Sequence, residues 1–324
     1  MNQKNEINLE KKSSQSFEEL PRENLVDRYR GCLFGLAIGN ALGTQSENLS
    51  LDDDIPTEFV GGGKDDVGPG VWTSDTSMAL CLAESLLTIG DHDARDQMER
   101  YARWHEEGHL SCTKKKLSLA LTIEKSIKDF IATGRPERSE QDPVLQANNG
   151  SLVRIAPVPM AFRNMPELKK MCAASSRTTH NIPVTIDACV LLGSIIEAGL
   201  QGAEKYVMLD EIPFELGTLE GNLEGLRRGD WKKKSIRDLK ITSNVVTTLE
   251  TAMWFFDHTG SFEDGILSIL EIGNDTRGIC SVYGQMAGSH YGYSGIPTKW
   301  TNNIKMKELL EVFADTLLEA SLPE

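Results

Sequence analysis

Several common signals are missing from this sequence of 324 residues. It contains no Cys-x-x-Cys pair, no phosphate loop of the Walker or GxGxxG type, and no sustained heptad repeat. Alternating runs that would predict β-strands are sparse. The longest apolar run near the start, residues 32–43, is too short to cross a bilayer, and residues 1–19 are too polar for a signal peptide. These absences argue against P-loop, dinucleotide-binding, coiled-coil and membrane proteins.

Positive charge is also scarce, with 34 Lys and Arg against 48 Asp and Glu and a net charge of −14. This balance argues against a nucleic-acid partner or an anionic membrane surface, but it would suit a basic protein partner and leaves room for a local basic pocket. The six cysteines are scattered, mostly within apolar helical patterns. We therefore expect reduced, buried thiols and a cytoplasmic location.

Helical periodicity runs through most of the chain and predicts an all-α fold. Residues 1–24 are polar and of mixed charge and predict a flexible N-terminal arm, whereas residues 25–324 predict one compact domain of many helices. The arm is either a frayed tail or a segment that becomes ordered on a partner. Within the domain, one helix carries a glycine at every fourth position: Gly31, Gly35, Gly39 and Gly43. Each costs about 1 kcal/mol relative to alanine, so the repeat predicts a central helix that another backbone approaches closely.

The segment Thr73-Ser74-Asp75 follows a Gly-Pro-Gly turn and precedes an apolar helical pattern. Side chains of these types are typical of helix N-caps, so a capped helix is the simplest interpretation. Carboxylate and hydroxyl oxygens are also the ligands that Mg²⁺ prefers, and a magnesium site is the alternative. A second polar segment, Asn149-Gly150-Ser151, predicts a turn whose backbone N–H groups could hold a phosphate.

Four segments in order resemble the ADP-ribosylglycohydrolases, from about residue 26 to about residue 300. They are residues 27–43 (DRYRGCLFGLAIGNALG), 72–80 (WTSDTSMAL), 149–154 (NGSLVR) and 283–288 (YGQMAG). The resemblance implies a compact all-α fold. It also implies hydrolysis, with two Mg²⁺ ions, of the N- or O-glycosidic bond that joins ADP-ribose to a protein side chain.

The resemblance also implies residue roles. Thr73-Ser74-Asp75 and the segment from Asp275 to Gly278 would supply the metal ligands, and Glu47 would be the acidic residue near the attacking water. Asp75 would share in catalysis, since negative charge near the reacting sugar carbon stabilises its oxocarbenium-like state. The phosphates of the ADP-ribosyl group would lie at Asn149, Gly150 and Ser151.

Several of these positions depart from the family pattern. Asn40 and Ser74 stand where the family has aspartates, and Arg277 and Gly278 stand where it has a ligand carboxylate and a ligand hydroxyl. A looser alignment also lacks an acid at residues 117–121. Arginine stays protonated, so Arg277 would repel a cation and could pair with Asp75 or Asp275 instead. The hypothesis is that the binuclear centre is lost or reduced to one weak Mg²⁺ site.

Two interpretations follow from these departures. In the first, the chain is a catalytically impaired pseudoenzyme that binds ADP-ribose or an ADP-ribosylated protein, or that docks onto a protein partner through its N-terminal arm. Some family members act as immunity proteins against ADP-ribosyltransferase toxins through such an arm, and the resemblance extends that role to this chain. In the second, the chain is an active ADP-ribosyl-protein hydrolase with a single-metal or rebuilt site, in which Glu47 or Asp75 activates water.

Overall fold

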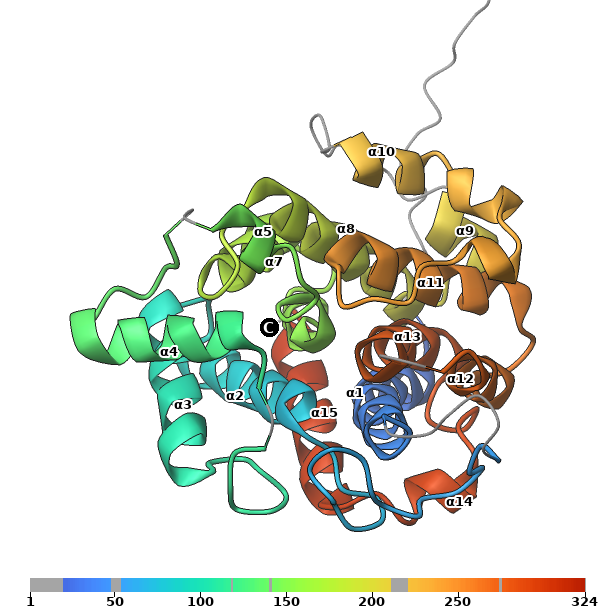
Figure 1. Ribbon diagram of the computed structural model, residues 1–324, viewed down its shortest axis with the longest axis horizontal. Coiled ribbons are helices and arrows are strands. Elements are labelled where there is room, and N and C mark those ends of the chain that lie inside the picture. Colours follow the sequence, from blue (N-terminus) through green and yellow to red (C-terminus); the bar gives the residue numbers. More distant parts are fainter. Residues whose placement is uncertain are drawn as a thin grey trace, which may run out of the picture.

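The computed structural model describes residues 20–47, 54–117, 119–139, 142–210, 221–273 and 276–323. Within these ranges the chain forms helices and two isolated β-bridges but no strand, so the predicted all-α fold is confirmed. Figure 1 shows the helices gathered around one central pair. The α-helices are α1 (Arg22–Gln45), α2 (Ser74–Ile89), α3 (Ala94–Glu107), α4 (Leu121–Thr133), α5 (Pro143–Gln146), α6 (Pro157–Ala161), α7 (Leu168–Arg177), α8 (Pro183–Leu200), α9 (Lys205–Asp210), α10 (Gly221–Arg227), α11 (Val245–His258), α12 (Phe262–Glu271), α13 (Thr276–Tyr291), α14 (Thr298–Thr301) and α15 (Lys307–Ser321). Three short 3-10 helices are η1 (Leu152–Arg154), η2 (Asp230–Lys233) and η3 (Ile236–Asp238).

Helices α1 and α13 form the central pair and lie directly against each other (Figure 1). A Cβ atom added to Gly35 would lie 2.1 Å from the carbonyl oxygen of Gly284, and one added to Gly284 would lie 2.0 Å from that of Gly35. No side chain larger than hydrogen fits at such a crossing. The same close approach is made at Gly31, Gly39 and Gly43. The glycine repeat therefore allows another backbone to approach α1 closely, as its unfavourable helix propensity predicted.

The N-terminal boundary of the domain lies earlier than predicted. Helix α1 begins at Arg22, and Leu20 packs against the hydrophobic core. Residues 22–24 belong to the first turn of this helix rather than to the arm. Their polar side chains are exposed, which is why apolar periodicity did not reveal them. The remainder of the predicted arm, residues 1–19, lies outside the described residues.

The core contains all the cysteines except Cys112, which is partly buried, and all six are unpaired thiols as expected. Burial raises the pKa of Cys112 to about 11, so this thiol stays protonated at neutral pH. In the described part of the chain, α8 is the one helix whose length and mean hydropathy of 1.6 would also suit a membrane span, and 72% of it is buried inside the protein. Burial of most of its length inside the protein is typical of a core helix.

Candidate ligand cavity

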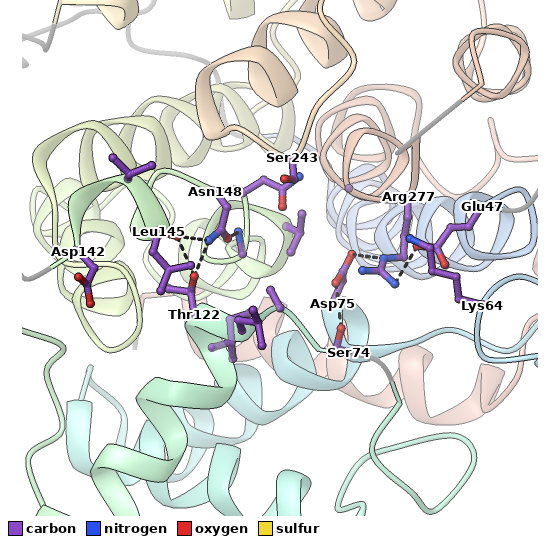
Figure 2. Close-up of a pocket in the computed structure, with 18 of the residues that line it drawn as sticks. Glu47, Lys64, Ser74, Asp75, Thr122, Asp142, Leu145, Asn148, Ser243 and Arg277 are labelled. Carbon is purple, nitrogen blue, oxygen red and sulfur yellow. Dashed lines mark hydrogen bonds and ion pairs between the residues drawn. The ribbon is translucent and has the colours of Figure 1, made fainter.

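A cavity of about 1000 Å³ opens where the C-terminal end of α1 and the N-terminal ends of α2 and α13 meet. Helices α4 and α5 and the turn at residues 148–150 form its other wall (Figure 2). The structure brings together here most of the side chains predicted to form a site: Glu47, Ser74, Asp75, Asn149, Gly150, Arg277 and Gly278. Thr73 and Ser151 are fully buried behind the wall, and Asp275 lies outside the described residues.

The start of α2 is hydrogen-bonded to a side chain of α1. Thr73 is the N-cap residue of α2, but its side chain makes no capping hydrogen bond. The carboxamide of Asn40, fully buried on α1, accepts from the Thr73 amide (2.7 Å) and the Thr76 hydroxyl (3.1 Å). Its Nδ2 donates to Thr73 Oγ1 (3.0 Å) and to Asp75 Oδ2 (3.3 Å). The Asn40 side chain therefore connects α1 to the start of α2 and directs an N–H donor at the Asp75 carboxylate.

The carboxylate of Asp75 is surrounded by donors. Besides Asn40, the Ser281 hydroxyl donates to its Oδ2 (2.9 Å) and the Ser74 hydroxyl donates to its Oδ1 (3.2 Å). The guanidinium of Arg277 lies 4.0 Å from Oδ2, which is the pairing expected from the sequence. The side chain of Asp75 is only 9% exposed, so the protein supplies most of its partners.

Arg277 makes its closer ion pair with Glu47, with 3.0 Å between Nη1 and Oε1. The side chains of Glu47 and Arg277 are 2% and 19% exposed. Figure 2 shows the guanidinium lying between Asp75 on one side and Glu47 on the other. The sequence did not suggest this second pair, because Glu47 and Arg277 are far apart along the chain and come together only through the α1–α13 crossing.

The partners of Asp75 bear on the magnesium ions that the family resemblance implies. Mg²⁺ requires a near-octahedral set of oxygen ligands at about 2.1 Å. Here Asp75 accepts hydrogen bonds from Asn40, Ser74 and Ser281, and the Arg277 guanidinium lies 4.0 Å from its Oδ2. Outside the gaps in the described chain, no group of three or more His, Cys, Asp or Glu side chains could hold a metal ion.

A zinc-type spacing also occurs in the chain, at His105-Glu-Glu-Gly-His109. Two histidines four residues apart bind one ion only if they share a helical face, and α3 ends before His109, with Gly108 in the left-handed conformation. His105 Nε2 lies 2.9 Å from the Lys116 ammonium, and His109 bonds to Glu84 (2.8 Å). The two rings therefore serve separate surface contacts.

The polar turn at residues 149–151 lies at the cavity, but the backbone N–H groups of Asn149 and Gly150 already have acceptors within the protein. The amide of Asn149 donates to the carbonyl of Ser243 (2.8 Å), and that of Gly150 donates to Asn148 Oδ1 (2.9 Å). The Ser151 hydroxyl faces the core and accepts from Ser176 (3.0 Å). A phosphate here would therefore have to be held by groups other than these two amides.

Gly278 provides space for Asn149. A Cβ atom added to Gly278 would lie 2.3 Å from Asn149 Nδ2, which donates to Thr248 Oγ1 on α11 (3.0 Å). The loss of a side chain at 278 is thus matched by a carboxamide that fills the space. Sequence reasoning treated the two positions separately, because nothing in the local pattern joins residues so far apart.

We expect Gly278→Ser to lower the free energy of unfolding by about 1–3 kcal/mol, the usual range for an overpacked site. Adding Asn149→Ala should restore most of the loss, because it removes the group that the new Cβ meets. Gly260→Ser is the control, since a Cβ added at Gly260 would have nothing within 4 Å. Denaturant unfolding gives the free energy of unfolding of the wild type and of the three variants. A Gly278→Ser protein as stable as the Gly260 control would contradict the predicted clash.

Lys64 is a cation at the cavity that sequence reasoning missed. It lies on a hairpin closed by the Gly62–Val67 bridge. The carboxamide of Gln45 holds the segment before it, donating to the Glu58 carbonyl (2.8 Å) and accepting from the Val60 amide (2.9 Å). The Gly-Gly-Gly-Lys sequence at residues 61–64 could have indicated a tight loop bearing one basic side chain.

Comparison with known proteins adds a family to this geometry. The family model for ADP-ribosylglycohydrolases matches residues 21–324. The "ADP-ribosylarginine hydrolase Tri1" of Serratia proteamaculans is 32% identical over 303 residues, covering 92% of this chain and 81% of the relative. The "ADP-ribosyl-[dinitrogen reductase] glycohydrolase" of Rhodospirillum rubrum is 26% identical, covering 88% of this chain and 93% of the relative. A solved structure titled "ADP-ribosylglycohydrolase-related protein complex" matches with a TM-score of 0.81 and 33% identity, covering 93% of this chain and all of that one.

Proposed function

This chain belongs to the ADP-ribosylglycohydrolase family, and we propose that it binds an ADP-ribosyl group in the cavity while hydrolysing the glycosidic bond poorly or not at all. The family acts on glycosyl bonds of ADP-ribosylated substrates. A cavity of about 1000 Å³ is at the upper end of the range for small-ligand sites and could accommodate a nucleotide sugar. Glu47, Asp75 and Arg277 line it at the ends of α1, α2 and α13, and Lys64 lines it from the turn at residues 62–67.

The observation that carries this proposal is the position of Arg277 between Glu47 and Asp75. A Mg²⁺ ion about 4 Å from the guanidinium would be repelled by several kcal/mol, even at an effective dielectric constant of about 20. Hydrolysis also needs an acid that can orient water, and here Glu47 is paired with Arg277 while Asp75 accepts from Asn40 and two serines. The same pairing supports at most one weak Mg²⁺ site.

The linkage and the partner are also proposals. Relatives from Serratia proteamaculans and Pseudomonas putida carry the name ADP-ribosylarginine hydrolase, which favours an ADP-ribosyl group attached to arginine. The matching solved structure is titled a complex, which favours a protein partner. We assign docking to residues 1–19, the part of the predicted arm that precedes the domain, and to a basic partner, given the net charge of −14. An immunity-type role falls within this proposal.

The second candidate is an active ADP-ribosyl-protein hydrolase with a single-metal or rebuilt site. The relatives' names favour it, because both of these Tri1 proteins are called hydrolases. In this case Glu47 or Asp75 would exchange its present partners for water when the substrate binds.

Calorimetry and a release assay separate the two candidates. We expect ADP-ribose to bind with an affinity that EDTA leaves unchanged, and ADP-ribosylarginine protein to release no ADP-ribose with or without Mg²⁺. Ser243→Trp, at the cavity wall, should abolish binding. Thr316→Trp, on the exposed side of α15, is the control and should not. Magnesium-dependent turnover would favour the second candidate, and absence of binding would reject the first.

A further inference from the structure

One side chain joins three parts of the cavity wall. The Nδ2 group of Asn148 donates to Thr122 Oγ1 on α4 (2.8 Å) and to the carbonyl oxygen of Leu145 on α5 (2.7 Å). Its Oδ1 accepts from the amide of Gly150 in the polar turn (2.9 Å). Figure 2 shows Asn148 bonded to the first two residues across the wall opposite Arg277. The relative positions of α4, α5 and the turn therefore depend on the orientation of this carboxamide.

His180 lies behind Asn148 and is fully buried. Its Nε2 is 2.9 Å from Asn148 Oδ1, and its Nδ1 is 2.8 Å from Thr179 Oγ1. Thr179 Oγ1 in turn accepts from the Arg154 guanidinium (2.6 Å). A Cβ atom added to Gly150 would lie 2.8 Å from Cε1 of the ring, so the imidazole packs tightly under the turn.

The direction of the His180–Asn148 hydrogen bond is set at the Asn148 end. The Leu145 carbonyl requires an N–H donor and the Gly150 amide requires an acceptor, so Oδ1 must face His180. Oδ1 can only accept, and His180 Nε2 therefore carries a hydrogen. At the other end, Thr179 Oγ1 accepts from Arg154 and has one hydrogen that it can donate to His180 Nδ1, which is compatible with a neutral ring.

The surroundings also oppose a charge on this ring. Burial lowers the pKa of His180 well below its ordinary value, and the positive charges of Arg154 and Arg138 lower it further. A protonated imidazole would also donate from Nδ1, so the hydrogen of Thr179 Oγ1 would have to turn away from the ring. The ring therefore stays neutral through the physiological pH range.

We propose that His180 is a positioning residue for the cavity, which holds Asn148 in one orientation through its Nε2–H and thereby fixes the wall formed by α4, α5 and the polar turn. The role concerns ligand binding and so rests on the proposed function. His180 lies outside the cavity lining and acts through Asn148, which lines it.

Two substitutions and a spectrum test this role. His180→Phe removes the donor, and we expect ADP-ribose affinity to fall by about tenfold, the effect of one lost hydrogen bond in its stronger range. His180→Gln can again donate to Asn148 Oδ1 and should recover most of that loss. In an Asn148→Ala background, His180→Phe should change the affinity by less than about twofold, because the group through which it acts is gone.

Gln97→Met is the control for loss of stability alone. Gln97 is also fully buried and hydrogen-bonded, but none of its partners lines the cavity: they are His92, Tyr101, Ser175 and Thr178. It should lower the melting temperature without changing ADP-ribose affinity. A His180→Phe protein that is less stable but binds like the wild type would overturn the positioning role.

Nitrogen-15 spectra of the histidines in the ligand-free wild-type protein test the tautomer without any ligand. We expect His180 to keep its hydrogen on Nε2 from about pH 5 to 8, around the ordinary histidine pKa. An Nδ1–H tautomer or a protonated ring would overturn the proposal. If the wild type does not bind ADP-ribose, the proposed function fails together with the ligand-binding role, whereas the spectra still decide the hydrogen-bond direction.

Discussion

Replacing Arg277 with methionine is expected to lower the free energy of unfolding by about 3 kcal/mol, at the lower end of the range for breaking a buried ion pair. The substitution leaves Glu47 and Asp75, which are 2% and 9% exposed, without their shared cation. Methionine keeps much of the apolar packing, so the loss is mainly electrostatic. For a domain of this size, the melting temperature should fall by about 6 °C.

An exposed ion pair provides the matched control. Arg22, at the start of α1, pairs with Glu319, and their side chains are 63% and 52% exposed. Arg22→Met should cost less than about 1 kcal/mol, because water screens such pairs. An Arg277→Met protein as stable as the Arg22 variant would mean that the guanidinium does not pair with these acids in solution. Arg277 would then no longer oppose a second magnesium ion beside Asp75.

The sequence allowed the fold class and the central helix to be predicted because their signals are local. Helical periodicity spans most of the chain, and four glycines in a soluble helix are too costly to persist without a close neighbour. Gly35 and its contact with Gly284 confirm that reasoning. The resemblance to a family also named residues that the fold brings together, since most of them line one cavity.

The partners of those residues could not be predicted, because each one depends on a contact between distant segments. Asn40 accepts from the Thr73 amide at the start of α2 only because α1 passes beside that helix. Glu47 pairs with Arg277 only because α1 and α13 cross. Gly278 was interpreted as a simple loss, although the structure shows that the carboxamide of Asn149 occupies the space. Periodicity and motif spacing carry no information on such pairs.

These distant contacts determine what a reconstructed metal site requires. Ser74→Asp with Arg277→Asp returns two carboxylates and removes the competing cation, and we expect Mg²⁺ affinity to rise by at least about tenfold. The double variant leaves Asn40 in place, and its Nδ2 lies 3.3 Å from Asp75 Oδ2 in the structure. Adding Asn40→Asp should raise the affinity further, because the donor becomes an acceptor. Calorimetry with MgCl₂ measures all three proteins.

The stabilisation by magnesium should increase in the same order, from the wild type to the double variant to the triple variant. Without metal, the added carboxylates repel Glu47 and Asp75, so both variants should melt below the wild type. Mg²⁺ that binds only the folded state stabilises it, by about 2.7 kcal/mol at a hundred times the dissociation constant. Lys240→Asp with Thr316→Asp makes the same change of charge at two exposed positions and should show no such effect. If neither reconstructed protein gains Mg²⁺ affinity, the charge of Arg277 is not the main reason that Mg²⁺ binds weakly. The cavity would then have diverged more widely from a metal site. Asn149, which occupies the space beside Gly278, would be the next position to change.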